Sequence, residues 1–224
     1  MENASPSLSS RSLATKRSRS MRTIKWLVGF LVLAVLADLV FLGPISPGIR
    51  KAKESAAMQT SRMIALAMFQ FANDNGGKYP TGRSSTEVFQ QLIAGKYVSD
   101  SAIFYIDMPG KSRPQTPQLE PENVCYDVTV PVDSSSPDGL PLVFLTGYRV
   151  EYKAGGSAIP LARFSSPFGR DGLAVCYKSN NAWFKPGLPI RDDGVIRNFV
   201  PAEFAAGGRH FQQLTPDGSL PPAP

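Results

Sequence analysis

Few residues in this sequence have the type and spacing that chemistry needs, and they form no catalytic set. His210 is the single histidine of the 224 residues, so a facial metal site or a proton relay lacks its second imidazole. The chain also lacks a Gly-x-Ser-x-Gly elbow, a phosphate loop and a Cys-x-x-Cys pair. We therefore expect a protein that is not an enzyme.

Two acidic turns are the remaining candidates for a metal site. Asp192 and Asp193 precede Gly194, and Asp217 precedes Gly218. Carboxylates are oxygen donors of the kind that Ca²⁺ takes in sets of about six to eight. Asp-Gly is equally an ordinary turn sequence, and the spacing here matches no defined calcium loop. Calcium is thus the candidate cofactor, with these three aspartates as its ligands.

Cys125 and Cys176 pose a second question. Both fall in predicted strands, and one disulfide between them would close about 50 residues and contribute about 4 kcal/mol in an oxidising compartment. The alternative is two buried thiols, because free cysteine is often part of a core. Strand pairing is not readable from the sequence, so both interpretations stay open.

An apolar segment near the N-terminus determines where these residues are placed. Residues 24–43 supply the length of about 20 residues that a helix needs to cross a bilayer. Residues 1–25 carry a net charge of +5 out of +6 for the whole chain. The positive-inside rule then leaves this arm in the cytoplasm and the rest outside. No clean cleavage site follows, so we expect a retained single-pass anchor rather than a removed signal.

The concentration of charge in the arm leaves the body of the protein nearly neutral. A basic isoelectric point that comes from one short arm is poor support for nucleic-acid binding. We expect inner-membrane lipid as a partner, and no nucleic acid.

Asp38 is the one charged residue of the apolar stretch 26–42 within the predicted span. A carboxylate in hydrocarbon costs a few kcal/mol unless it is paired or protonated. It either contacts a cationic partner in an assembly or, as we favour, lies close enough to the outer interface to reach water.

A second helical segment follows the span. Pro44 and Pro47 predict a kink, and residues 44–77 are rich in good helix formers. Apolar residues recur there at spacings of three and four, which predicts an amphipathic helix that packs this row on a body. The row consists of Ile49, Ala52, Ala56, Met63, Leu66, Ala67 and Phe71. Asn75-Gly76-Gly77 and Pro80 predict its end.

Residues 26–80 resemble the N-terminal region of type IV pilins and type II secretion pseudopilins, above all the major pseudopilins. The resemblance is carried by the apolar helix, by Pro47 before the amphipathic half, and by the segment Asn73-Asp74-Asn75-Gly76-Gly77-Lys78-Tyr79-Pro80. It implies a structural subunit of a type II secretion or pilus-related assembly, with other pilin-like subunits or secretion-system components as partners. It also implies an inner-membrane anchor with a periplasmic C-terminal domain, and it supports calcium in a C-terminal loop.

The resemblance places the processing site at Gly29-Phe30, the one Gly-Phe pair of the chain. Family members carry a Glu at the fifth residue after cleavage, and here that residue is Ala34. Counting back from Pro47 starts the processed chain at Trp26 and puts Phe30 in the Glu place. The site is therefore degenerate. A membrane-tethered binding or interaction module that uses a pilin scaffold without polymerising is the alternative function.

The remaining sequence predicts an α+β ectodomain. Ser84 to Glu87 forms a capping box before a short second helix that Gly95 ends. Residues 97–106, 123–132, 142–152, 173–185 and 195–200 are expected to be extended, with turns at 179–181 and 215–218. We thus expect a pilin-like fold with a long N-terminal helix and an antiparallel sheet of about four to five strands. The expected parts are a disordered arm 1–23, a span 24–43, a stalk helix 44–77, an ectodomain 78–218 and a flexible tail 219–224.

Overall fold

The structure, a computed structural model, describes residues 26, 28–31, 45–161, 168, 172–186 and 194–220. The chain divides into two compact units, residues 1–52 and 53–224. Most of the predicted span 24–43, including Asp38, lies outside the described residues, and so does Pro44. Within the part that is described, no helix combines the length and the apolar character that crossing a membrane requires.

Helix α2 (Ile45–Asp74) confirms the helical prediction for the stalk segment. Pro47 lies in its first turn, where the missing N–H removes no helical hydrogen bond. The helix ends at the predicted glycines. Gly76 and Gly77 have φ values of +64° and +82°, and the Gly77 amide donates to the Ala72 carbonyl at 2.8 Å. This left-handed termination is what glycine permits without steric cost.

Helix α3 (Ser85–Ala94) begins as its capping sequence predicts. The Ser84 hydroxyl accepts a hydrogen bond from the Glu87 amide at 3.1 Å, and Gly95 caps the C-terminus. The prediction that residues 97–106 form an extended segment is wrong. The Asp100 carboxylate accepts from the Ala102 amide at 2.8 Å and starts the 3₁₀ helix η1 (Ser101–Phe104). A second short 3₁₀ helix, η2 (Pro121–Asn123), precedes the sheet.

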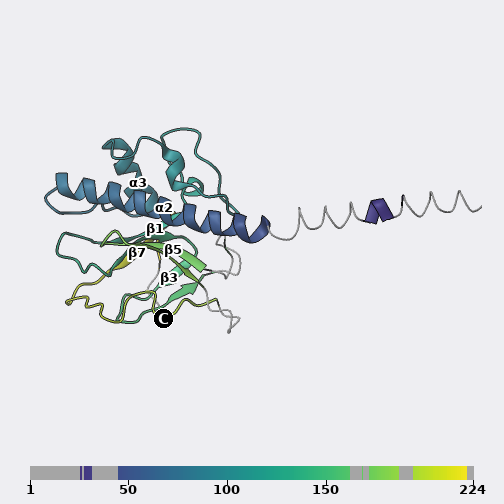
Figure 1. Ribbon diagram of the computed structural model, residues 1–224. Helices are drawn as coiled ribbons and strands as arrows, with labels where there is room; N and C mark the ends of the chain where they lie inside the picture. Colours follow the sequence, from purple (N-terminus) through teal and green to yellow (C-terminus); the bar gives the residue numbers. More distant parts are fainter. Residues whose placement is uncertain are drawn as a thin grey trace, which may run out of the picture. The chain divides into compact units, whose positions relative to one another are not determined.

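The main sheet is antiparallel and has the strand order β6-β5-β2-β1-β7-β8. Its strands are β1 (Tyr126–Val130), β2 (Pro141–Leu145), β5 (Gly172–Tyr177), β6 (Ala182–Pro186), β7 (Gln212–Thr215) and β8 (Gly218–Ser219). A separate hairpin joins β3 (Tyr148–Val150) to β4 (Ala158–Pro160). The antiparallel α+β class is therefore as predicted (Figure 1).

Several strand boundaries differ from the prediction. The expected strand 142–152 is broken at Gly147, whose φ is +101°, so that β2 and β3 belong to different sheets. The expected strand 195–200 contributes one isolated bridge, between Ile196 and Ala158. The turn at 179–181 between β5 and β6, and the turn at 215–218 between β7 and β8, are confirmed.

The two faces of the main sheet have different covers. In the second unit, α2 and α3 lie over one face, and the hairpin with β3 lies on the other side (Figure 1). Alternation along β1 points Tyr126 and Val128 to one face and Asp127 and Thr129 to the opposite face. Tyr126 lies beside Thr60 of α2, so Asp127 and Thr129 belong to the face away from the helices. The core on the helix side includes the stacked rings of Phe89 and Phe104, 4.5 Å apart.

Candidate functional site

Helix α2 buries a row that overlaps only partly with the one the sequence suggested, because Ala67 of the predicted row is buried and Phe71 is half-buried. The buried row consists of Ala57, Ser61, Ile64, Ala65, Ala67, Met68 and Ala72. Of the predicted row, Met63 is 57% exposed and Leu66 is 44% exposed. The buried row contains a serine, which hid it from the pattern. The Ser61 hydroxyl donates to the Met58 carbonyl at 2.8 Å, so its burial leaves no unpaired donor.

The helix consequently presents a second apolar row to solvent. We call Met63, Leu66 and Phe69 the outer apolar row; Phe69 is 49% exposed. Single exposed apolar residues are common on protein surfaces, but three large ones at a regular spacing of three are not a random scatter.

A groove runs between this side of α2 and the segment 97–113. One part has a volume of about 550 Å³ and is lined by Met63, Leu66 and Gln70 of the helix and by Val98 and Ile103 opposite. A second part of about 390 Å³ lies beside Lys53 and Ala56. Thr60, Ala102 and Arg113 line both parts. We call the two parts together the α2 groove.

The walls of the α2 groove are tied together at one end. The Tyr97 hydroxyl donates to an Asp74 carboxylate oxygen at 2.8 Å, and this hydrogen bond raises the pKa of Tyr97. The Tyr97 ring also packs edge-on against Phe71, with 5.5 Å between ring centroids. The segment 97–113 is thereby held beside the helix.

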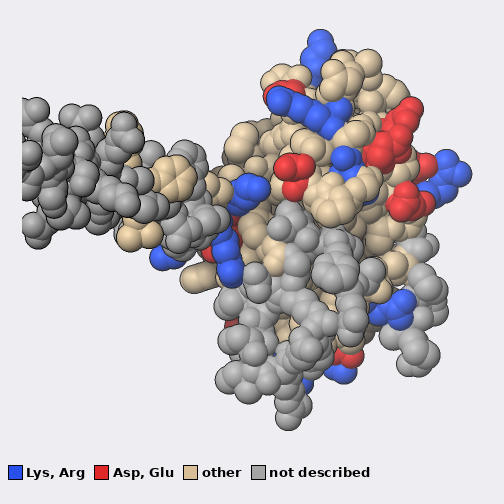
Figure 2. All heavy atoms as spheres, turned by 90° about the vertical axis from the view of Figure 1, so that its right-hand side faces the viewer, with Lys and Arg blue, Asp and Glu red and all other residues tan. Residues whose placement is uncertain are grey.

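The charges near the α2 groove are of both signs. Lys53 and Arg113 line it, and so do Asp100 and Asp107. On the face shown in Figure 2, the Lys and Arg side chains likewise lie among Asp and Glu side chains. The apolar lining, rather than a single sign of charge, therefore dominates what this groove presents to a partner.

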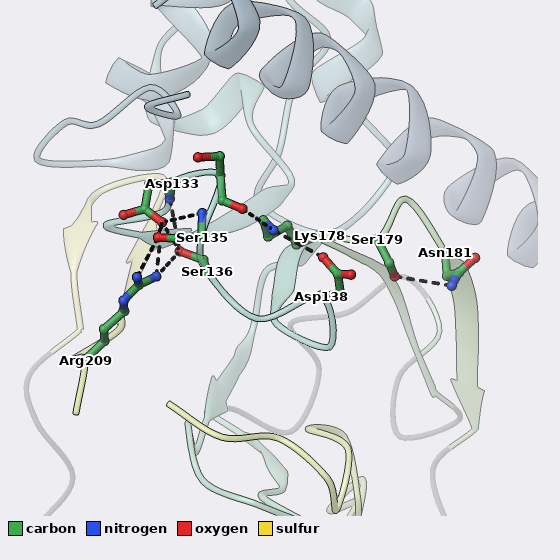
Figure 3. A network of polar contacts seen from close by, with 9 residues as sticks. Asp133, Ser135, Ser136, Asp138, Lys178, Ser179, Asn181 and Arg209 are labelled. Atoms are coloured by element: carbon green, nitrogen blue, oxygen red, sulfur yellow. Dashed lines mark hydrogen bonds and ion pairs between the residues drawn. The ribbon is translucent and has the colours of Figure 1, made fainter. Parts of the chain in front are cut away.

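A polar network lies at the loop 133–138, which follows β1 (Figure 3). The Arg209 guanidinium contacts the Asp133 carboxylate at 3.0 Å and the hydroxyls of Ser135 and Ser136 at 2.6 and 3.1 Å. The hydrogen bond that the Ser135 hydroxyl donates to Asp133 lowers the pKa of this carboxyl group. Lys178, whose side chain is 9% exposed, donates to the Ser134 carbonyl and contacts Asp138 at 3.2 Å. These polar groups satisfy one another.

The same loop is attached to the end of α2. The Ser134 amide donates to the Gly77 carbonyl at 2.9 Å, and the Tyr79 amide donates to the Val132 carbonyl at 3.1 Å. The network therefore joins the helix terminus, the β5–β6 turn and the segment around Arg209. We interpret it as a structural tie and not as a binding site.

A second polar cluster lies on the face of the main sheet away from α2 and α3. Asp127 and Gln213 are 0% and 4% exposed, and the Gln213 amide nitrogen donates to a carboxylate oxygen of Asp127 at 2.6 Å. Thr129 donates to the Pro141 carbonyl, and its oxygen lies 2.8 Å from the Tyr152 hydroxyl. Burial raises the pKa of Asp127 to about 7. The sequence pattern of β1 gave no sign of a buried acid, because alternation alone does not show that both faces are covered.

The two cysteines are free and buried, so the structure favours the thiol interpretation over the disulfide. Cys125 precedes β1 and Cys176 lies in β5, and β2 separates these strands. Two strand spacings amount to about 10 Å, beyond the distance of roughly 7 Å between Cα atoms that a disulfide spans. Burial raises the thiol pKa of Cys125 to about 11 and that of Cys176 to about 12.

These thiols should be unreactive in the folded chain. At pH 8 we expect a maleimide or an aromatic disulfide reagent to modify fewer than about one in ten of them in minutes, because the thiolate is scarce and inaccessible. In denaturant without reductant, two thiols per chain should react. The exposed variant Ser99→Cys is the matched control and should label at once in the folded protein. If the denatured chain reacts only after a reductant is added, the two cysteines form a disulfide and the thiol interpretation is wrong.

The other predicted site residues are described only in part. Gly29 and Phe30 are helical, and the Phe30 ring is 72% exposed. Asp192 and Asp193 lie outside the described residues. Asp217 lies in the β7–β8 turn, and the described residues contain no group of three His, Cys, Asp or Glu side chains that could hold a metal. His210 is exposed.

Comparison with known proteins does not assign this chain to a family. No family model, no curated protein and no solved structure matches it. The outer apolar row and the α2 groove beside it are the features of the described residues that offer a contact surface to a partner.

Proposed function

We propose that this chain is a membrane-anchored, pilin-like structural subunit of a type II secretion or pilus-related assembly. In this proposal residues 24–43 anchor the chain in the inner membrane, the basic arm stays in the cytoplasm, and the domain containing the sheet lies in the periplasm. The protein acts by lateral association and performs no catalysis. The fold proposed is a pilin-like one, with the long helix laid on an antiparallel sheet.

The observation that carries the proposal is the outer apolar row of α2. A helix that serves only its own domain needs one apolar stripe, and α2 has two. Leaving Met63, Leu66 and Phe69 in water forgoes the stabilisation of roughly 25 cal/mol for each Å² that burial would bring. Association with a neighbouring subunit would recover it. The row therefore supports contact between helices of adjacent subunits.

The α2 groove supports the same contact. It is lined by Met63 and Leu66 on one side and by Val98 and Ile103 on the other. Side chains from a neighbouring helix that enter it would be surrounded by apolar groups, which is how knobs pack into holes.

Cross-linking in native membranes tests this proposal. Leu66→Cys should give dimers and higher species with a short thiol-reactive cross-linker, because the position lies on the contact surface. Ala202→Cys, exposed on the loop that follows Val200, is the matched control and should give monomers. Adding Met63→Glu to Leu66→Cys should reduce cross-linking at least fivefold, since a charge would enter the contact. Equal cross-linking of the two cysteine variants would contradict the proposal.

The volume of the α2 groove favours a second candidate, a membrane-tethered binding module that does not polymerise. The two candidates differ in their mature N-termini. A processed subunit loses residues 1–25 or 1–29, whereas a tethered binder retains the basic arm and is monomeric. The intact mass of protein purified from native membranes separates them.

A further inference from the structure

The side-chain amide of Gln213 links the β3–β4 hairpin to the main sheet, beside a second contact between Thr129 of β1 and Tyr152 in the hairpin loop. Gln213 of β7 donates through its nitrogen to the Tyr148 carbonyl at 2.5 Å and to Asp127 at 2.6 Å. Its oxygen accepts from the Val150 amide at 3.0 Å. Both donors and the acceptor of this amide are in use, so Gln213 joins β7, β1 and β3 at one point.

The acid in this contact is incompletely paired. Asp127 is fully buried, and among the described residues only the side chains of Gln213 and Thr146 supply hydrogen bonds to a carboxylate that can accept about four. An ionised carboxylate at this position has too few hydrogen bonds to compensate for the loss of its water. The neutral acid is less costly to bury, so it needs fewer of them. The packing of the hairpin over Asp127 therefore favours the protonated form.

The groups around Asp127 do not reverse this preference. Thr146, Gln213 and, more weakly, Lys111 favour the ionised form, and Asp217 opposes it. Tyr152, in the loop that joins β3 to β4, lies near the acid, and its own burial raises its pKa, so it remains neutral. Arg149 alternates to the side of β3 away from Tyr148 and Val150. Desolvation outweighs these contributions and leaves the pKa of Asp127 at about 7.

We propose that Asp127 and Gln213 form a proton-dependent latch, in which closing the β3–β4 hairpin onto the sheet is coupled to binding one proton at Asp127. When the hairpin opens, water reaches the carboxyl group and the proton is released. Acidification then tightens the hairpin, and a rise in pH loosens it. This inference is independent of the proposed function.

The sign of the effect follows from linkage. The closed state binds the proton more strongly than the open state, whose carboxyl resembles an ordinary aspartate near 3.8. The equilibrium constant for opening should therefore rise tenfold per pH unit between about pH 4 and pH 7, and level off above.

Hydrogen exchange on the full chain in mild detergent tests the latch. The reporter is the Val150 amide, which donates to Gln213, with amides of β1 and β2 as the reference. Its protection factor, corrected for the intrinsic rate at each pH, should fall about fiftyfold from pH 5 to pH 7. Low denaturant should leave it unchanged, because local opening exposes little surface.

Two variants make the result decisive. Asp127→Asn should make the protection factor of Val150 independent of pH. Thr146→Val removes a contact that lowers the pKa of Asp127, so the pH at which this protection factor stops falling should be higher. The proposal is overturned if Val150 shares the denaturant dependence of β1 and β2 at every pH. It is also overturned if the profile of Asp127→Asn matches that of the natural chain.

Discussion

Replacing Asp127 by Asn should make the protein more stable at neutral pH, although it removes a side chain from the centre of the fold. We expect the free energy of unfolding at pH 8 to rise by about 1–3 kcal/mol. The natural chain should lose about 4 kcal/mol between pH 4 and pH 7 through Asp127, and the variant should lose none of it.

The sign comes from the direction of the pKa shift. The folded state raises the pKa of Asp127 from 3.8 to about 7, chiefly because burial removes the charge from water. The folded state thus binds the proton more strongly than the unfolded chain. Its contribution to stability is complete below pH 3.8 and is lost as the pH rises through the folded pKa. The Asn amide keeps an acceptor for Gln213 but leaves its own N–H unpaired, which is why the expected gain is smaller than the full 4 kcal/mol.

Denaturant titrations of the full chain in detergent at each pH from 4 to 8 would measure this effect. Asp138→Asn is the matched control, because the Asp138 side chain is 80% exposed and Lys178 keeps its hydrogen bond to the Ser134 carbonyl without it. That variant should change stability by less than about 1 kcal/mol at any pH. Parallel profiles for Asp127→Asn and the natural chain would show that Asp127 is ionised in the fold.

The sequence predicted those elements whose signals are local. Ser84 and Glu87 form a cap whichever surface the helix meets, and Asn75-Gly76-Gly77 ends a helix by backbone conformation alone. The turn between β5 and β6 has the same local character. Prediction was wrong where local signals compete. Residues 97–106 contain β-favouring side chains, but the Asp100 cap turns the chain into η1.

The candidate site was harder to predict because it depends on how α2 is rotated about its axis. The predicted row and the buried row both satisfy the spacing of three and four and share Ala67. The predicted row lies across the edge of the buried surface, because Met63 and Leu66 are exposed while Phe71 is half-buried. Ser61 weakens the buried row in the pattern, yet its hydroxyl bonds to the helix backbone and is tolerated in the core. The buried Asp127 was equally hidden, because its burial depends on a hairpin that packs on the sheet from elsewhere in the chain.

Two adjacent residues of α2 should separate stability from association. Ile64 is 0% exposed and faces the sheet, so Ile64→Ala should lower the free energy of unfolding by about 2–5 kcal/mol. Met63 is 57% exposed, so Met63→Ala should change it by less than about 0.5 kcal/mol. Alanine favours helix at both positions, so helix propensity does not explain a difference.

In the cross-linking experiment, Met63→Ala should have the larger effect and Ile64→Ala the smaller one. Under native conditions, Met63→Ala should weaken cross-linking through Leu66→Cys, while Ile64→Ala should preserve it in the fraction of chains that remains folded. Adjacent helical residues differ in direction by about 100°, so the pair determines which side of α2 meets the sheet. If Met63→Ala proves the more destabilising of the two, the helix is turned toward the row that its sequence suggested, and the outer apolar row belongs to the core instead of to a neighbouring subunit.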